Sequence, residues 1–166
     1  MGILKVIQNT NSTEDYLLNA LNYIVYKAEV VGYGAYHVST ENPFQQMMAV
    51  KRYFGKTSGN LLIHFVVCFD TRVDNPAIAL KYAQKIAYYY GNRFQTVYSI
   101  HEKPTYHKGK VQSLYHAHFI LNSVSFSDGK MFSQGKGDIY EFAEYIKKVT
   151  HDYKWRFVWG DCDSNY

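Results

Sequence analysis

The sequence is poor in cysteine and has no long apolar run. Its two cysteines, Cys68 and Cys162, are too few for a disulfide scaffold and favour a reducing, cytoplasmic location. No apolar run reaches transmembrane length, so we expect no membrane insertion. Residues 1–8 lack the apolar segment and small-residue cleavage site of a signal peptide. Repeats, low-complexity tracts and linkers are also absent, which favours a single domain over residues 1–166.

Charge and aromatic content permit a nucleic-acid partner but do not require one. The net charge is +4 and the pI is about 8.9, a mild basicity. The 17 tyrosines and 10 phenylalanines exceed what a core needs, and exposed tyrosines beside lysines can stack on unpaired bases. An aromatic-rich core with tyrosine hydroxyls at its surface is the alternative, and composition alone favours it.

Apolar periodicity and turn residues predict an α+β fold with a central, mostly antiparallel sheet and helices packed on one face. Thr13 precedes two acids at the start of the first helix, and Asp138 is expected to cap the last one. Tyr23 lies at the margin of the first helix's apolar stripe. The expected strands cover residues 2–8, 61–70, 94–102, 114–124 and 155–159, with an extended segment at 32–39 and a short strand near 131; the expected helices cover about 14–27, 44–54, 76–91 and 138–153.

Two histidines, His116 and His118, stand two residues apart in a predicted strand and therefore point to the same face. A hairpin centred between Lys108 and Gly109 would place His101 directly opposite His116, with Cβ atoms about 4.5–5.5 Å apart. Three imidazoles with open positions are typical of a catalytic metal site. The prediction depends on the register, because a slip of one residue would turn His101 to the other face. Exposed or hydrogen-bonded histidines are the alternative.

The other histidines and the metal preference follow from position and ligand chemistry. His64 shares a strand face with apolar residues, so it either supports a metal ligand or is a structural residue at the core edge. His37, His107 and His151 are expected at the surface. An all-histidine site suits Mn²⁺, Zn²⁺, Co²⁺ or Ni²⁺, and Mg²⁺ also fits if substrate phosphate oxygens complete its coordination. We expect Mn²⁺ or Mg²⁺.

Six segments stand out together by their order and spacing: Leu21-Asn22-Tyr23-Ile24 and residues 50–57, 63–69, 97–101, 116–124 and 126–132. In this combination they resemble the MOBP-like plasmid mobilisation relaxases of Gram-positive type, which belong to the wider HUH endonuclease group. In the segment around His64, Cys68 stands where that family usually has serine, which removes a hydroxyl contact to DNA phosphate.

The resemblance implies a site- and strand-specific endonuclease that nicks a plasmid or mobile-element transfer origin and starts conjugative mobilisation. Tyr23 would attack the scissile phosphate and form a 5′-phosphotyrosine link, beside a divalent metal held by the three histidines. Implied partners are single-stranded DNA at the origin, accessory DNA-binding proteins and a type IV secretion coupling protein. The candidate DNA contacts are Lys27, Lys51, Arg52, Lys56, Cys68 and Asn122.

Three other interpretations stay open at this point. A rolling-circle replication initiator, also an HUH enzyme, would use Tyr145 in the sequence Tyr145-Ile146-Lys147-Lys148. A relaxase-like domain without catalysis would only bind DNA. A metal hydrolase of small substrates would turn over independently of salt, whereas DNA binding weakens steeply as salt rises. Within the relaxase interpretation, Tyr26 is the nearest substitute for Tyr23.

Overall fold

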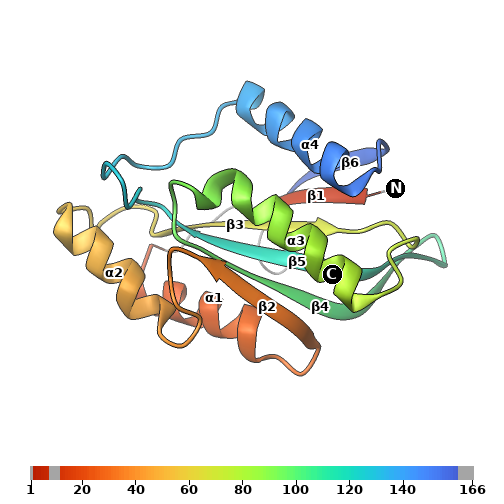
Figure 1. The fold of residues 1–166 in the computed structure, drawn as a ribbon, viewed down its shortest axis with the longest axis horizontal. Helices are drawn as coiled ribbons and strands as arrows, with labels where there is room; N and C mark the ends of the chain where they lie inside the picture. Colours follow the sequence, from red (N-terminus) through yellow and green to blue (C-terminus); the bar gives the residue numbers. More distant parts are fainter. Residues whose placement is uncertain (1, 8–11, 161–166) are drawn as a thin grey trace.

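The computed structural model describes residues 2–7 and 12–160, which form strands and helices close to those the sequence predicts (Figure 1). The arrangement of helices and strands belongs to the expected α+β class. In chain order the elements are β1 (Gly2–Ile7), α1 (Glu14–Tyr26), β2 (Val30–Tyr36), α2 (Pro43–Tyr53), β3 (Leu62–Cys68), α3 (Pro76–Gly91), β4 (Thr96–His107), β5 (Lys110–Asn122), α4 (Lys136–Thr150) and β6 (Trp155–Gly160).

The described strands form one six-stranded sheet in the order β2-β4-β5-β3-β1-β6. Every neighbouring pair is antiparallel except β1 and β6, which run parallel. The mostly antiparallel sheet and the central position of the apolar strand β3 are thus confirmed. Among the described residues, no helix is long and apolar enough to cross a membrane.

The helices cover both faces of the sheet, so the expectation that they pack on one face is wrong (Figure 1). Helices α3 and α4 pack on the face that carries Phe65, Ala117 and Phe119. Helices α1 and α2 pack on the opposite face, against Val97 and Ile120. The physical reason is that the buried strands are apolar on both faces, so each face needs its own cover.

Capping hydrogen bonds mark where the first and last helices begin. The Thr13 side chain accepts a hydrogen bond from the Tyr16 N–H at 3.2 Å and caps α1. The last helix begins at Lys136, two residues before the expected cap. Asp138 occupies the third helical position, where its carboxylate accepts the Gly135 N–H at 2.7 Å.

The β4–β5 hairpin has the register that the sequence predicts. Lys108 and Gly109 both have positive φ, 49° and 74°, as a two-residue type I′ turn requires. His107 pairs with Lys110 at the turn, and His101 pairs with His116 further along. The pairing is irregular on both sides of Thr105 but returns to its original register by Glu102. The hairpin therefore brings His101 to the face of His116 and His118.

Candidate active site

His101, His116 and His118 form a buried cluster in the middle of the sheet. Their ring centroids lie 5.4 Å (His101–His116), 4.4 Å (His101–His118) and 5.1 Å (His116–His118) apart. One ring nitrogen from each lies within 4.8 Å of the other two. All three side chains are at most 1% exposed. Three nitrogens this close can bind one cation together, because each needs to move only slightly to reach metal–ligand distance.

The second nitrogen of each ring faces a hydrogen-bonding group. His101 Nε2 donates to the carbonyl of Ile24 at 3.0 Å. That carbonyl belongs to the last turn of α1, where helical carbonyls have no partner within the helix. The His116 ring bonds to the backbone of Lys103, in the irregular part of β4. Metal-binding histidines usually donate their other N–H in this way, which fixes the ring and leaves one nitrogen for the metal.

His64 contacts the cluster directly. Its Nε2 lies 2.9 Å from His118 Nδ1, so a metal at the cluster would be bound by His118 Nε2. This contact favours a supporting role for His64 over a purely structural one. His37, His107 and His151 are exposed, as expected.

Burial keeps the cluster neutral. It lowers the pKa of His116 to about 4 and that of His64 to about 3, and the charges of neighbouring histidines act in the same direction. Burial also lowers the pKa of His101 and places that of His118 well below its ordinary value. Neutral imidazole is the form that binds metal.

The residues therefore fit a divalent metal ion. His101 Nδ1 is buried and has no hydrogen-bond partner in the part of the chain that the structure describes. A buried ring nitrogen without a partner is costly unless something else binds it. Three neutral imidazoles are suitable donors for Mn²⁺ and related ions.

Tyr23 lies beside the cluster, late in α1. Its ring centroid is 5.8 Å from that of His101 and 5.6 Å from that of His118. Partial burial raises the pKa of Tyr23, and the negative charge of Glu29 raises it further. The Lys27 ammonium lies 4.3 Å from the centre of the Tyr23 ring. A tyrosine hydroxyl protonated at neutral pH is thus placed next to a candidate metal site.

The two alternative tyrosines lie elsewhere. Tyr26 is 71% exposed at the end of α1. Tyr145 belongs to α4, across the sheet, where its hydroxyl donates to the Lys85 carbonyl at 2.6 Å and its ring packs on Tyr89. Of the three candidates, Tyr23 is the one that the structure brings to the histidines.

Two candidate DNA contacts, Lys51 and Asn122, are buried and bond to each other, so they are not exposed phosphate-binding groups. The Lys51 Nζ donates to Asn122 Oδ1 and, at 2.9 Å, to Ser123 Oγ. Asn122 in turn donates to Gln95 Oε1 at 2.9 Å. The amphipathic pattern of α2 did not reveal this, because lysine is rarely buried without a carboxylate partner. Their role here is to join α2 to the end of β5.

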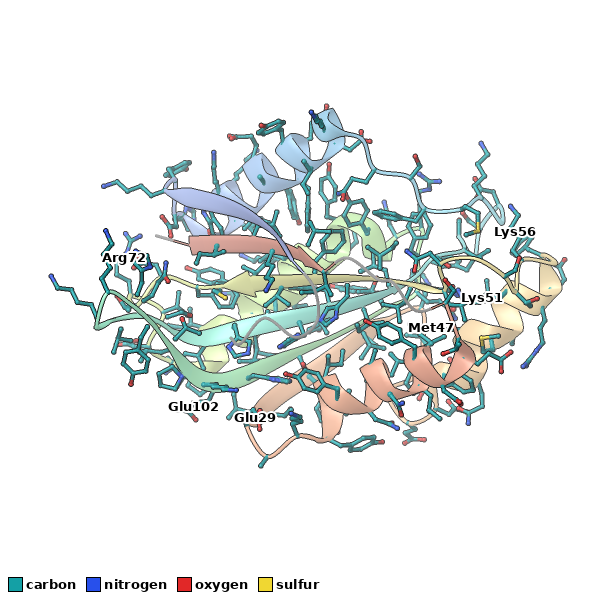
Figure 2. The ribbon with its side chains drawn as sticks, turned by 180° about the vertical axis from the view of Figure 1, so that it is seen from behind. Glu29, Met47, Lys51, Lys56, Arg72 and Glu102 are labelled. Atoms are coloured by element: carbon teal, nitrogen blue, oxygen red, sulfur yellow. The ribbon has the colours of Figure 1, made fainter. Side chains whose placement is uncertain are left out.

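The remaining candidates differ in their surroundings. Lys56 donates to the Gly129 carbonyl. Arg52 is exposed, with a guanidinium nitrogen 3.9 Å from Glu14. Cys68 pairs with His116 across the sheet, but it is buried, and burial raises the pKa of its thiol to about 12. Lys51 and Lys56 also lie at the opposite end of the molecule from Glu29 and Glu102, as Figure 2 shows.

Burial of Lys51 predicts a pH-dependent stability. Burial lowers its pKa to about 7, from an ordinary value of 10.5 that the unfolded chain retains. Between pH 7 and 9 the unfolded chain therefore binds a proton that the folded chain has lost, and the free energy of unfolding rises with pH. We expect a rise of about 2–3 kcal/mol in urea unfolding from pH 7 to pH 9.

Lys51→Met should remove most of that rise, whereas replacement of the exposed Lys148 by methionine should leave it unchanged. Comparing each variant with the unmodified protein cancels the other titrating groups. Equal pH slopes in the protein and in Lys51→Met would contradict the burial of a neutral amine.

Glu29 is a site residue that sequence reasoning missed. It follows α1, and its charge acts on both Tyr23 and His101. Its backbone carbonyl accepts the Glu102 N–H at 2.8 Å, which attaches the start of β2 to β4. One weak signal was present, an acid six residues after the candidate nucleophile.

Comparison with known proteins agrees with this geometry. A model of the MobA/VirD2-like relaxase nuclease domain matches residues 16–155, a segment that contains Tyr23 and all three clustered histidines. Searches of curated proteins and of solved structures gave no match. The match covers most of the chain and confirms the resemblance seen in the sequence. The chain belongs to the family of MobA/VirD2-like relaxase nuclease domains, which nick DNA for mobilisation.

Proposed function

We propose that this domain nicks one strand of a plasmid or mobile-element transfer origin through a covalent link to Tyr23. The observation that carries the proposal is the position of the Tyr23 ring, less than 6 Å from two histidines of a three-histidine cluster. A nucleophile and a set of metal ligands from distant parts of the sequence meet at one point. The family match supplies the DNA substrate.

The proposed step is a transesterification. The Tyr23 hydroxyl oxygen bonds to the scissile phosphorus, and the bond from phosphorus to the 3′ oxygen breaks. The products are a 5′-phosphotyrosine and a free 3′ hydroxyl, which takes up the proton that tyrosine loses. One phosphodiester replaces another, so religation by the reverse reaction needs no nucleotide cofactor.

The residues around Tyr23 have distinct proposed roles. Because the pKa of Tyr23 is raised, its hydroxyl is a poor nucleophile unless positive charge is brought nearby. Lys27, above the ring, supplies one such charge and can also contact phosphate. A divalent ion bound by His101, His116 and His118, Mn²⁺ or Mg²⁺ by our proposal, would polarise a phosphoryl oxygen and stabilise transition-state charge. His64 holds the ring of His118.

Partners follow from the proposed reaction. The substrate is single-stranded DNA at a transfer origin, and the proposal extends to accessory DNA-binding proteins and a type IV secretion coupling protein. Arg52 and Lys56 remain proposed phosphate contacts along α2 and the turn after it. Phosphate contacts of this kind do not read the edges of bases, so recognition of the DNA sequence must come from other residues.

The test is to incubate the protein with Mn²⁺ and a library of single-stranded oligonucleotides, then to map any covalent adduct by mass spectrometry. The tryptic peptide 6–27 contains Tyr16, Tyr23 and Tyr26, and fragmentation distinguishes them. We expect a nucleotide on Tyr23. An adduct on Tyr145 would favour the replication-initiator alternative. Binding that weakens with salt but gives no adduct would favour a domain that only binds DNA.

Metal binding should depend little on pH in the neutral range. Burial lowers the pKa of all three clustered histidines, that of His116 to about 4, so protons compete with a metal at pH 6 much less than at histidines of ordinary pKa. We expect the dissociation constant for Mn²⁺, measured by calorimetry in the absence of DNA, to change less than about threefold between pH 8 and pH 6. Three histidines of ordinary pKa would lose roughly 60-fold in metal affinity over the same interval. Such a loss would refute the proposal that the cluster is neutral at pH 6.

A further inference from the structure

A second feature lies away from the histidine cluster, where the chain leaves β3 and where α4 ends. A cavity of about 270 Å³ opens there. Its apolar walls include the rings of Phe69, Tyr82 and Trp155. Its polar wall is formed by Asp70, Arg72, Thr150, His151 and Asp152.

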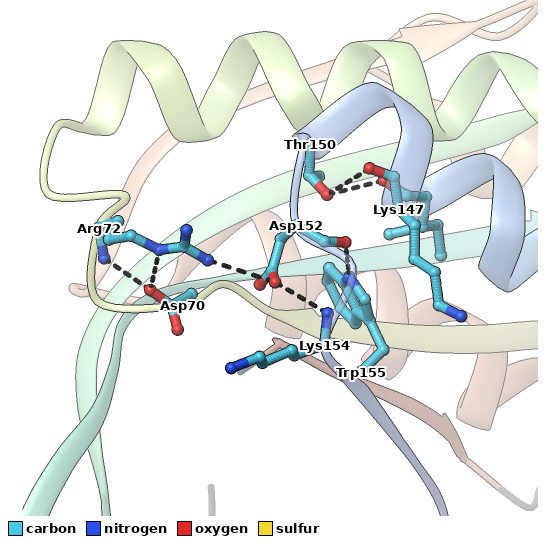
Figure 3. A network of polar contacts seen from close by, with 8 residues as sticks. Asp70, Arg72, Lys147, Thr150, Asp152, Lys154 and Trp155 are labelled. Atoms are coloured by element: carbon cyan, nitrogen blue, oxygen red, sulfur yellow. Dashed lines mark hydrogen bonds and ion pairs between the residues drawn. The ribbon is translucent and has the colours of Figure 1, made fainter.

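Asp152 is the unusual member of this wall (Figure 3). The residue is only 6% exposed. Its Oδ1 accepts the Lys154 N–H at 3.1 Å and lies 3.3 Å from an Arg72 nitrogen. Its Oδ2 is buried and has no hydrogen-bond partner within the described residues. A buried carboxylate oxygen is a strong acceptor, and leaving it without a donor is costly.

The side chains around Asp152 in the polar wall are held in place by bonds within the protein. Arg72 bonds to Asp70 at 2.7 Å and also reaches Asp152, so its guanidinium is shared between two carboxylates. The Trp155 indole N–H donates to the Asp152 carbonyl at 2.6 Å, which holds the ring against the cavity. These bonds hold Oδ1 and the backbone carbonyl of Asp152 in place and do not involve its Oδ2.

We propose that this cavity binds a guanidinium or ammonium group carried on a short apolar stem. Three observations favour a cation. Asp152, in its wall, carries a carboxylate oxygen without a partner among the described residues, aromatic residues line it, and α4 ends beside it at Thr150. Aromatic faces attract cations, and so does the C-terminal end of a helix.

The size of the cavity selects a small group. Pockets that enclose drug-sized ligands measure about 300–1,000 Å³, so this one suits a group of side-chain size. Two sources have this chemistry, a free small amine and an arginine or lysine side chain of a protein partner. DNA does not, because its phosphate is an anion and brings no donor for Asp152 Oδ2. The site is therefore independent of the proposed nicking reaction.

The experiment follows the Trp155 indole N–H by NMR in the absence of DNA and metal, while n-butylguanidinium is added. We expect a saturating shift in the millimolar range. The neutral isostere n-butylurea should bind at least about tenfold more weakly. Asp152→Asn should weaken guanidinium binding about tenfold or more, and Asp128→Asn, an exposed carboxylate outside the cavity, should leave it unchanged.

A second variant protects the test against misfolding of Asp152→Asn. Ile78 lines the cavity and is 44% exposed, so Ile78→Trp fills the space without touching the polar network; it should abolish binding. Comparing n-butylguanidinium with the blocked peptide Gly-Arg-Gly distinguishes the sources: equal binding indicates a partner's side chain, and loss with the peptide indicates a free amine. The proposal would be overturned by any of three results: no saturable shift, equal binding of n-butylurea and n-butylguanidinium, or guanidinium binding that is unchanged in both variants.

Discussion

Tyr23→Phe should leave a folded protein that binds single-stranded DNA but forms no covalent adduct. The substitution removes one oxygen and keeps the ring, which packs beside His101 and His118, so the cluster should be undisturbed. Removing the nucleophile of a covalent mechanism typically costs about 10⁴-fold or more. We expect nicking below detection on denaturing gels and a dissociation constant for DNA within about twofold of the unmodified protein.

Two matched variants serve as controls for this result. Tyr26→Phe removes a hydroxyl from the same helix at an exposed position, and Tyr145→Phe removes the hydroxyl that bonds to Lys85. Both should retain the adduct. A Tyr23→Phe protein that still forms an adduct, together with its loss in Tyr145→Phe, would refute our assignment of the nucleophile.

His118→Ala should remove both metal binding and nicking. His118 is at the centre of the cluster, close to both of the other histidines and to His64. Two histidines hold a divalent ion much less tightly than three, so we expect no saturable Mn²⁺ binding by calorimetry. If the bound ion contributes about 4 kcal/mol to the transition state, nicking should fall about 10³-fold.

His64→Phe should have a smaller effect on the same two measurements. It keeps an aromatic ring but removes the hydrogen bond that orients His118. Loss of such an orienting partner usually weakens metal affinity about 10- to 100-fold, and excess Mn²⁺ should restore most of the nicking. Equal defects in the two variants would mean that His64 binds the metal itself, and no defect in His64→Phe would mean that its contact is only structural.

Much of the site was predictable because it depends on the alternation of side chains between the two faces of a strand. The alternation of His116 and His118, with the turn at Lys108 and Gly109, was enough to place His101 opposite His116. The position of Tyr23 could not be obtained from periodicity alone. It required knowing that α1 crosses the histidine face, which depends on packing between distant residues such as Leu21 and Ile120.

Other features of the structure could not be predicted from local sequence patterns. The near-continuous apolar run of residues 61–70 is typical of a strand buried on both faces, but the pattern does not say which helices cover each face. Lys51 looked like a surface cation on α2, and only the tertiary structure shows its amine enclosed with Asn122. Glu29 stood in a connection between elements, where no periodicity applies.

The hydrogen bond from His101 to the Ile24 carbonyl has a mechanical consequence. Ile24 is the residue after Tyr23, so the carbonyl that accepts from His101 lies one residue along the helix from the candidate nucleophile. A tilt or sliding of α1 would displace the Tyr23 hydroxyl and the hydrogen-bond partner of the His101 ring at the same time. If the two residues act as proposed, an engineered change in the packing of α1 would therefore alter metal affinity and nucleophile position together.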